Sequence, residues 1–549
     1  MHEKLPPPIV WVIAGNDSGG GAGLSADQRA IAAFGVHACP VVATVTAQNS
    51  VAVTRVEAVS ADLLDAQLAA LAADMPPAAI KTGLLGNAEQ VAVVARWVDR
   101  LRLQQPGLPL VVDPVLRAST GRDLATDPLF QALRDVLLPR ATLFTPNRAE
   151  AARLLGLTVD ESSELTVAQV PDLAQALQQL GQPDSATSVV VTGGDAASPS
   201  RDADCGTGTE SGGCHDWLTS PHASGWLSLP RVATPHHHGT GCTFASSAAA
   251  VLALGFVPAD AVVLAKMATT EGLRHAHAAG AGAGPLRPQP GFAQRLANLP
   301  TFSLPGALHP AMPLQPAPPV LAGTQRQLGL YPVVDSADWV ERVLAAGVRT
   351  VQLRIKNPQQ PDLREQVRRS VQAARAVGAQ LYINDHWQLA IEEGAFGVHL
   401  GQEDLSTANV QAIARARLHL GLSTHSLWEV CRAWALRPSY LACGPIHATT
   451  SKDMPWLPQG NGNLAFWSHL LPLPVVGIAG MDAPRLREAV RHGAAGVALI
   501  SAITAAAEPE QAIQALQHAW QEGASDAPVG SPLLPQTTLD PQRSWKSPG

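Results

Sequence analysis

Two glycines flank a threonine in His236-His237-His238-Gly239-Thr240-Gly241-Cys242-Thr243-Phe244, and an Ala-rich segment, residues 245–255, follows directly. Glycine lets the backbone turn tightly and approach a ligand closely. The helix that the Ala-rich segment predicts would begin with unpaired N–H groups and the positive end of the helix dipole. Together these features predict an anion site, for which phosphate is the natural ligand. A plain turn before a helix is the alternative interpretation of this segment taken alone.

Around this segment, short apolar runs alternate with longer helix-favouring segments from residue 9 to about 298. The predicted strands are Ile9–Ala14, Val41–Thr46, Leu110–Asp113, Leu143–Thr145 and Val189–Thr192. Each is followed by turn residues and an Ala/Leu-rich segment, a pattern typical of βα units on a mostly parallel sheet. Residues 195–216, rich in Ser, Asp, Gly and Thr, predict a surface loop. We therefore expect an α/β domain over residues 1–298.

The composition changes near residue 299. Residues 299–324 carry repeated prolines and almost no charge, which predicts an extended linker. Eight strands are predicted beyond it: Tyr331–Asp335, Val351–Ile355, Leu381–Asp385, Gly397–Gly401, Leu418–Ser423, Tyr440–Gly444, Val475–Ile478 and Val497–Ser501. Eight βα repeats in about 200 residues indicate a compact (β/α)8 TIM barrel over residues 325–525. The Pro/Ser-rich tail, residues 526–549, is expected to be disordered.

The net charge, the cysteines and the lengths of the apolar segments exclude several classes of protein. A net charge of −7 without a basic run argues against a nucleic-acid partner. The 6 cysteines form no CxxC pair, so there is no zinc signature, and they suit a reducing cytosol. No segment approaches the roughly 20 apolar residues that span a bilayer. We therefore expect a cytoplasmic protein that uses neither membrane nor nucleic acid.

In the first half, polar residues gather where the predicted strands end. A glycine loop, residues 14–23, closes the first strand, and Asp27 follows it. Lys81-Thr82-Gly83 and Val112-Asp113-Pro114 lie at other strand ends, where open α/β sheets bind ligands. Asn147 and Glu150 offer oxygens that could hold hydrated Mg²⁺ near phosphates. Helix capping or turn formation is the alternative role of each of these residues.

The order of these motifs resembles the hydroxymethylpyrimidine/phosphomethylpyrimidine kinases of the ribokinase-like superfamily. The matching motifs are AGNDSGGGAGLSAD (14–27), TAQN (46–49), KTGLLGN (81–87), VVDPVL (111–116), TPNRAEA (145–151), VVVTGGD (189–195) and HGTGCT (238–243). The resemblance implies a three-layer α/β fold and the use of ATP and Mg²⁺. It places the pyrimidine at Gly15 and Gln48, with Asp27 in the same pocket. It also implies an anion hole at residues 239–242 and assigns the nucleotide and Mg²⁺ to Asp113, Asn147 and Glu150.

Cys242 stands where related sugar kinases carry aspartate. A thiol of ordinary pKa about 8.5 can act as a base once a helix N-terminus lowers that pKa. We therefore expect Cys242 to be the base for the substrate hydroxymethyl group, and the alternative is that it only shapes the anion hole. Three adjacent histidines in a loop cannot all face one ion, and only His238 belongs to the motif, so we do not expect a metal site at residues 236–238.

In the second half, Gln352, Arg354 and Lys356 share one face of a predicted strand, because side chains on a strand alternate. A purely structural barrel interior would be aliphatic, so two cations near the strand end indicate a bound anion. Asn384-Asp385 ends the next strand, and residues 402–404 follow the fourth. Carboxylates at neighbouring strand ends beside cations suit Mg²⁺ bridging a pyrophosphate.

These motifs resemble thiamine-phosphate synthase across about residues 325–520. The matching motifs are QLRIK (352–356), YINDHWQLA (382–390), GVHLGQEDL (397–405), GLSTH (421–425), CGPIHATTSK (443–452) and GIAGM (477–481). The resemblance assigns the pyrimidine to Gln352 and the reacting centre to Ser423. It implies that pyrophosphate is bound by Arg354, Lys356, Asn384 and Lys452. It implies that Mg²⁺ is bound by Asp385 and Asp404. It also places the substrate phosphates at Thr449 and Ser451 and the thiazole phosphate at Gly480 and Ser501. Ala479 departs from the motif, where a glycine is frequent.

The two implied reactions are consecutive. The first half would make hydroxymethylpyrimidine pyrophosphate from two ATP, and the second would join it to thiazole phosphate, giving thiamine phosphate and pyrophosphate. One alternative pairs a pyridoxal-type kinase with a thiazole tautomerase, which shares the barrel fold. Another makes the barrel a sensor of thiamine phosphate. Both families commonly form homo-oligomers, and a proline-rich linker favours free diffusion of the intermediate.

Overall fold

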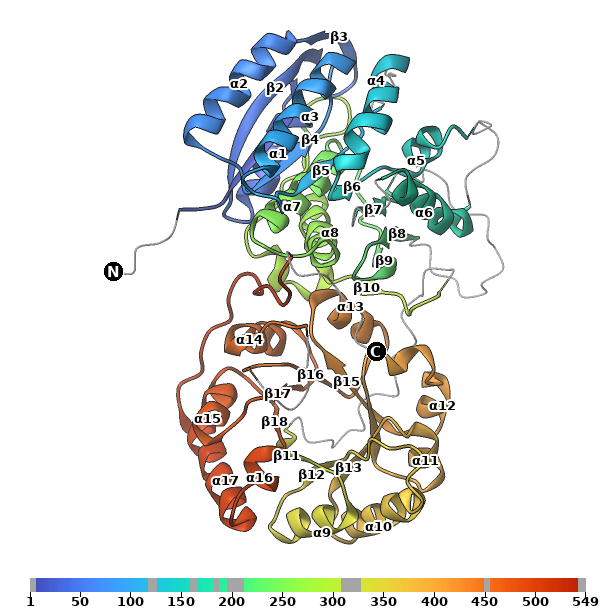
Figure 1. The fold of residues 1–549 in the computed structure, drawn as a ribbon, viewed down its shortest axis with the longest axis vertical. Helices are drawn as coiled ribbons and strands as arrows, with labels where there is room; N and C mark the ends of the chain where they lie inside the picture. The colour runs from blue at the N-terminus through green and yellow to red at the C-terminus, as the bar shows by residue number, and fades with distance from the viewer. Residues whose placement is uncertain are drawn as a thin grey trace. The chain divides into compact units, whose positions relative to one another are not determined.

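The computed structural model describes residues 6–116, 126–157, 166–181, 187–194, 212–307, 327–448 and 455–541. The chain forms two compact units, the first mostly Met1–Ser303 and the second mostly Met312–Leu539 (Figure 1). None of the helices in the described ranges is long and apolar enough to cross a membrane.

The first unit is built on a ten-stranded sheet with the order β10-β9-β8-β7-β6-β5-β4-β1-β2-β3. Its strands are β1 (Ile9–Asp17), β2 (His37–Gln48), β3 (Val53–Ala58), β4 (Ala79–Thr82), β5 (Leu110–Val112), β6 (Leu143–Phe144), β7 (Ser188–Val191), β8 (Gly213–Thr219), β9 (Ser224–Pro230) and β10 (Thr301–Phe302). The central strands are parallel, while β3 and β8 to β10 extend the two edges antiparallel. The sequence order reverses between β1 and β4, so ligands are expected at the carboxyl ends of these strands.

Helices cover both faces of this sheet. They are α1 (Gly23–Ala32), α2 (Ala61–Asp74), α3 (Ala88–Arg102), α4 (Asp127–Ala132), α5 (Arg148–Leu154), α6 (Val170–Leu180), α7 (Thr240–Ala253) and α8 (Pro258–Arg274). Trp11 and Ile13 of β1 join one apolar core with residues of α2, α3, α5 and α6. Val10 and Val12 are equally buried outside that core, as strand alternation requires, and α1, α7 and α8 pack together. The ribokinase-like three-layer prediction is confirmed.

The second unit is a closed parallel barrel with its helices outside the strands (Figure 1). Its strands are β11 (Gly329–Val334), β12 (Thr350–Leu353), β13 (Gln380–Asn384), β14 (Gly397–Leu400), β15 (His419–Thr424), β16 (Tyr440–Cys443), β17 (Val475–Ile478) and β18 (Gly496–Leu499). Its helices are α9 (Ala337–Ala345), α10 (Leu363–Ala376), α11 (Trp387–Glu392), α12 (Val410–Arg415), α13 (Leu427–Ala435), α14 (Gly460–Leu470), α15 (Ala483–Arg491), α16 (Ser501–Thr504) and α17 (Pro509–Ser525). β18 pairs with β11 and closes the ring, so the predicted (β/α)8 barrel is confirmed.

Two predicted loop segments are partly secondary structure. The predicted linker begins too early, because β10 pairs with β9 and buries Phe302 in the first unit. Residues 308–324 of that linker lie outside the described residues. The predicted surface loop ends too late, because β8 begins at Gly213 and pairs with β7, and residues 195–211 also lie outside the described ranges.

The expected disorder of residues 526–549 is wrong for residues 526–541. Thr538 and Leu539 are buried, and the Leu457 amide donates to the Thr538 carbonyl at 2.9 Å. The side chain of Asn463 on α14 both accepts from the Gln536 amide and donates to its carbonyl. An apolar anchor and paired backbone groups hold a segment whose composition suggested disorder. Residues 542–549 are outside the described residues.

Candidate active sites

The start of α7 is open toward a ligand. Gly239 precedes this helix with φ 85°, and a Cβ there would lie 2.3 Å from the Gly21 carbonyl oxygen, so only glycine fits. In the described structure no side chain caps α7. A Cβ at Gly241 would meet no atom within 4 Å, so the space in front of the first turn is free. Uncapped amides facing free space are what an anion hole needs.

A buried charge cluster lies beside this helix. The Lys81 Nζ atom is 3.0 Å from Asp27 Oδ1 and 3.7 Å from Asp113 Oδ2, and Ser246 of α7 donates to Asp27 Oδ1 at 2.7 Å. Although burial favours the neutral amine, the two carboxylates raise the pKa of Lys81, which therefore stays charged. Burial raises the pKa of Asp113 to about 6 against the opposing effect of Lys81. The Asp27 Oδ2 atom is buried and accepts no hydrogen bond from the described residues.

Cys242 belongs to the same cluster. Burial raises the pKa of its thiol to about 12, the carboxylates of Asp27 and Asp113 add to the rise, and Lys81 and the Gly23 amide oppose it. The expectation that the helix start would lower this pKa is therefore wrong. Removal of the thiol from water and the two nearby negative charges raise its pKa by more than the helix start lowers it. In this structure the thiol is protonated at neutral pH.

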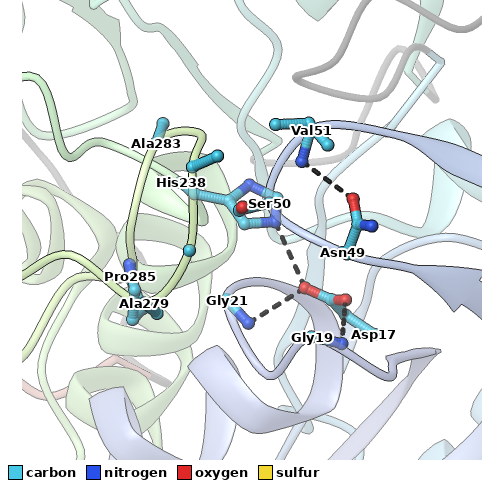
Figure 2. Close-up of a pocket in the computed structure, with 12 residues that line it drawn as sticks. Asp17, Gly19, Gly21, Asn49, Ser50, Val51, His238, Ala279, Ala283 and Pro285 are labelled. Carbon is cyan, nitrogen blue, oxygen red and sulfur yellow. Dashed lines mark hydrogen bonds and ion pairs between the residues drawn. The ribbon is translucent and has the colours of Figure 1, made fainter.

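Asp17 holds the glycine loop against the His238 ring. It accepts hydrogen bonds from the amides of Gly19, Gly21 and Ala22 at 2.8–2.9 Å, and His238 Nε2 lies 3.2 Å from its Oδ2 (Figure 2). Despite its burial, the hydrogen bonds from His238 and the amides lower the pKa of Asp17. His238 thus joins the two glycine-rich loops.

The predicted pyrimidine residues border these loops. Gln48 Nε2 lies 3.3 Å from His238 Nε2, and its Oε1 lies 3.3 Å from the Thr46 hydroxyl. A Cβ at Gly15 would lie 2.5 Å from Thr44 Oγ1. A pocket of about 280 Å³ lies against His238 (Figure 2). It is lined by Asp17, Gly19, Gly21, Asn49, Ser50, Val51, His238, Ala279, Gly280, Ala281, Ala283 and Pro285.

Asn147 and Glu150 form a capping box at the start of α5. Asn147 Oδ1 accepts from the Glu150 amide at 2.9 Å, and Glu150 Oε2 accepts from the Asn147 amide at 3.0 Å. Glu150 Oε1 also accepts from the Leu116 amide at 3.2 Å. These two residues therefore cap α5, which was the alternative role given to them above. A metal ion bound directly to them would have to share oxygens that already accept hydrogen bonds.

The sequence analysis gave no role to Asp17 and Ser246, and it named Lys81 and His238 only as parts of motifs. Asp17 and Lys81 stand inside the quoted motifs, so a charged residue within a glycine loop or at a strand end was an available signal. Ser246 lies within the Ala-rich helix, and only tertiary packing brings it to Asp27.

In the barrel, the predicted anion residues follow the carboxyl ends of neighbouring strands. Arg354 comes directly after β12 and is partly buried, whereas Lys356 is exposed. Asn384 is the last residue of β13 and is buried. Asp385 follows it with φ 61°, a strained conformation for a residue other than glycine.

Asp385 and Asp404 lie against each other. Burial and the neighbouring Asp404 carboxyl raise the pKa of Asp385 to about 7, and Arg354 opposes this rise. The Gly401 amide donates to Asp404 Oδ2 at 2.9 Å. Two hard oxygen ligands held side by side fit Mg²⁺, which binds through one or two carboxylates and completes its shell with water and phosphate oxygens. In the described ranges, no group of three or more His, Cys, Asp or Glu side chains is placed to hold a metal ion.

Gln352 lies in β12 and Ser423 in β15, and the other predicted barrel residues lie after β17 and β18 or outside the described ranges. Gly480 has φ 66°, and a Cβ there would lie 2.8 Å from the Ala448 carbonyl oxygen. Ala479, which departs from the motif, has φ 82° and bears the strain that glycine would avoid. Ser501 begins α16 and is exposed. Thr449, Ser451 and Lys452 lie outside the described residues.

These features define a chain of two α/β units, each with charged side chains gathered at the carboxyl ends of parallel strands. The family model for phosphomethylpyrimidine kinase matches residues 17–287, and that for thiamine monophosphate synthase matches residues 329–503. Thiamine-phosphate synthase of Yersinia pseudotuberculosis is 46% identical over 203 residues, 37% of this chain and 94% of that protein. That of Neisseria meningitidis is 47% identical over 194 residues, 35% of this chain and 95% of that protein. The chain belongs to the thiamine-phosphate synthase family through its second half, and its first half is a phosphomethylpyrimidine kinase domain.

Two solved kinase structures are similar to about half of this chain. Phosphomethylpyrimidine kinase from Clostridium difficile has 27% identity and a TM-score of 0.39, covering 48% of this chain and 98% of that chain. Pyridoxal kinase from Bacillus subtilis, in an ADP complex, has 28% identity and a TM-score of 0.43, covering 51% and 97%.

Proposed function

We propose that the first unit transfers phosphoryl groups from ATP to hydroxymethylpyrimidine and then to its monophosphate. In each step a substrate oxygen attacks the γ-phosphorus and ADP leaves. The observation that carries this proposal is the uncapped start of α7 beside the charged Lys81. Phosphoryl transfer needs positioned positive charge more than covalent chemistry, and the amides at residues 239–242 with Lys81 would supply it.

The substrate proton needs an acceptor. Cys242 stays the proposed base. Because its thiol is protonated at rest, it must lose that proton before it can accept one from the substrate. The alternative is that Cys242 only shapes the anion hole. Asp113, whose pKa is about 6, is a carboxylate in the same cluster at neutral pH. Asn147 and Glu150 would hold hydrated Mg²⁺ beside the nucleotide phosphates. Bound Mg²⁺ would neutralise the negative charge that develops on the transferring group.

We further propose that the barrel joins the pyrimidine pyrophosphate to thiazole phosphate. The thiazole nitrogen forms a bond to the pyrimidine CH₂, the C–O bond breaks, and its electron pair leaves with pyrophosphate. Arg354, Lys356 and Asn384 would bind the departing pyrophosphate, and Asp385 with Asp404 would hold its Mg²⁺. The adjacent carboxylates support this role, because Mg²⁺ would relieve their repulsion. Gly480 and Ser501 would bind the thiazole phosphate.

We also propose that the protein acts in the cytoplasm as a homo-oligomer with small-molecule substrates only. Sedimentation at several protein concentrations tests the assembly, and a single species with the mass of one 57.3 kDa chain would exclude it.

One assay tests the whole proposal. The full chain is given ATP, Mg²⁺, hydroxymethylpyrimidine and thiazole phosphate, and thiamine phosphate and ADP are followed together. Two ADP and one thiamine phosphate are expected per pyrimidine consumed. Supplying the pyrimidine pyrophosphate directly isolates the second unit, whose failure to release pyrophosphate would reject the synthase role.

A further inference from the structure

A line of polar side chains crosses the inside of the barrel and ends at Ser423. Gln352 Nε2 donates to the Tyr331 hydroxyl at 3.2 Å, and that hydroxyl lies 2.7 Å from the hydroxyl of Tyr440. His399 Nδ1 is 2.7 Å from the Tyr440 hydroxyl, and His399 Nε2 is 2.8 Å from Ser423 Oγ. We call these five residues the Tyr–His chain. It connects the two side chains that the sequence associates with the pyrimidine and with the reacting centre.

The Tyr–His chain is held rigidly. Tyr331 is 1% exposed and Tyr440 0%, and their rings meet edge to face with centroids 5.7 Å apart. The His399 ring stacks on Tyr440 at the same centroid distance. Barrel interiors are usually filled by branched aliphatic side chains. Buried hydroxyls in their place keep their hydrogen bonds, since a broken one would leave a desolvated polar group.

The His399 ring is hydrogen-bonded on both sides, at Nδ1 to the Tyr440 hydroxyl and at Nε2 to the Ser423 hydroxyl. A neutral imidazole carries one N–H, so one ring nitrogen donates and the other accepts. The hydrogen bonds on the two sides of the ring therefore cannot be chosen independently.

A tyrosine hydroxyl donates one hydrogen bond and can accept two, so these contacts allow two proton orders. In one order Ser423 donates to His399 Nε2 and keeps no proton for the substrate. In the other order Tyr331 donates to Tyr440, and Tyr440 donates to His399 Nδ1. Nε2 then carries the imidazole proton and donates it to Ser423 Oγ. The hydroxyl proton of Ser423 is left over and can be given to a substrate atom.

We propose that His399 is a positioning residue of the synthase, which takes its tautomer from Tyr440 and turns the Ser423 hydroxyl proton toward the substrate. This inference rests on the synthase function proposed above. It gives Ser423 a defined task, as a hydrogen-bond donor to an electron-rich atom of the bound pyrimidine pyrophosphate.

A double-mutant cycle in the full chain tests this proposal. The variants are Tyr440→Phe, Ser423→Ala and the pair together, assayed with the pyrimidine pyrophosphate and thiazole phosphate. Each single change is expected to lower kcat about 10- to 100-fold, because a misplaced group near the reacting atoms costs rate of that order. The double variant is expected to be no slower than Ser423→Ala alone, because Tyr440 acts only through Ser423.

Tyr382→Phe is the matched control. Tyr382 packs its ring against Tyr331 and Tyr440, with centroids 5.8 and 5.1 Å away, and its hydroxyl is not part of the Tyr–His chain. This change should leave kcat within about twofold, and any small loss should multiply with that of Ser423→Ala. Multiplying losses for Tyr440→Phe and Ser423→Ala would overturn the proposal.

The tautomer is read independently by ¹⁵N NMR of the histidine-labelled protein, with His399→Gln identifying the signal. An Nε2-protonated neutral ring is expected, and an Nδ1-protonated ring would overturn the proton order. Wild-type protein that makes no thiamine phosphate would reject the proposed function itself. Active wild type with an additive cycle rejects only the role of His399.

Discussion

Burial decides the protonation of several single residues. Cys242 sits at a helix start, which favours the thiolate, yet burial and the charges of Asp27 and Asp113 raise its pKa to about 12. His215 on β8 is half-buried beside Lys266, and burial lowers its pKa to about 4. Both pKa shifts are caused by residues that are distant in the chain and close in the fold. The pH dependence of activity and of stability can therefore test them.

The pH dependence of the kinase separates the two roles of Cys242. If Cys242 is the base, kcat of the wild type should rise about tenfold per pH unit up to the thiol pKa in the ternary complex, and Cys242→Ala should abolish the rise. Cys242→Ser, which keeps size but not acidity, should be as slow as the alanine variant. Near-normal turnover of Cys242→Ala would instead mean that the thiol only shapes the anion hole.

His215 should make the first unit sensitive to acid. The folded state holds His215 neutral below its ordinary pKa of 6.5, so its contribution to stability is complete above pH 6.5 and is lost as the pH falls toward 4. The free energy of unfolding should fall by up to about 1.4 kcal/mol per pH unit across this window. His215→Gln, which can still bond Ser228, should flatten the slope in urea titrations at pH 7, 6 and 5. An unchanged slope would contradict this assignment.

Individual elements are set by glycine geometry and by capping. Gly239 turns the chain into α7 in a conformation and a space that no other residue fits, while Gly241 in the first turn has open space around it. One glycine-rich segment therefore contains a glycine that its surroundings require and a glycine that borders open space. Polar side chains do similar work elsewhere, because Asn147 and Glu150 cap α5 and Asp17 ties down the first glycine loop.

Gly239→Ala and Gly241→Ala form a matched pair. Gly239→Ala should lower the free energy of unfolding by at least about 1–2 kcal/mol, from the positive φ alone, and should abolish kinase turnover. Gly241→Ala should leave the melting temperature unchanged and raise the KM for ATP, because its methyl group enters the open space before the helix. Thermal unfolding and kinase kinetics check both, and equal melting temperatures would contradict the distinction.

The whole molecule carries two reactions in two compact units. The pyrimidine pyrophosphate made by the first is the substrate proposed for the second, and the composition of the proline-rich segment between them predicts a spacer. Free diffusion of the intermediate is therefore the simplest connection.

Mixing two half-active variants tests that connection. Gly239→Ala should lack kinase activity and retain the synthase, and Arg354→Ala should do the reverse. Equal amounts of the two should together make thiamine phosphate from hydroxymethylpyrimidine, after a lag while the intermediate accumulates. Each variant alone should make almost none. A mixture far slower than wild type at a saturating intermediate concentration would indicate direct transfer instead.

The sequence alone was enough for both folds and both families, because they depend on local signals. Strand periodicity, glycine turns and motif order can all be recognised in the linear sequence. All eight barrel strands were predicted to within a few residues. Only the tertiary structure decided how the site residues interact. It paired Lys81 with Asp27 across 54 positions, raised the pKa of Cys242, and joined Tyr440 to Ser423 through His399. It also anchored the Pro/Ser-rich tail on α14. Burial, charge pairing and hydrogen-bond direction arise from groups brought together in space, and no local pattern in the chain encodes them.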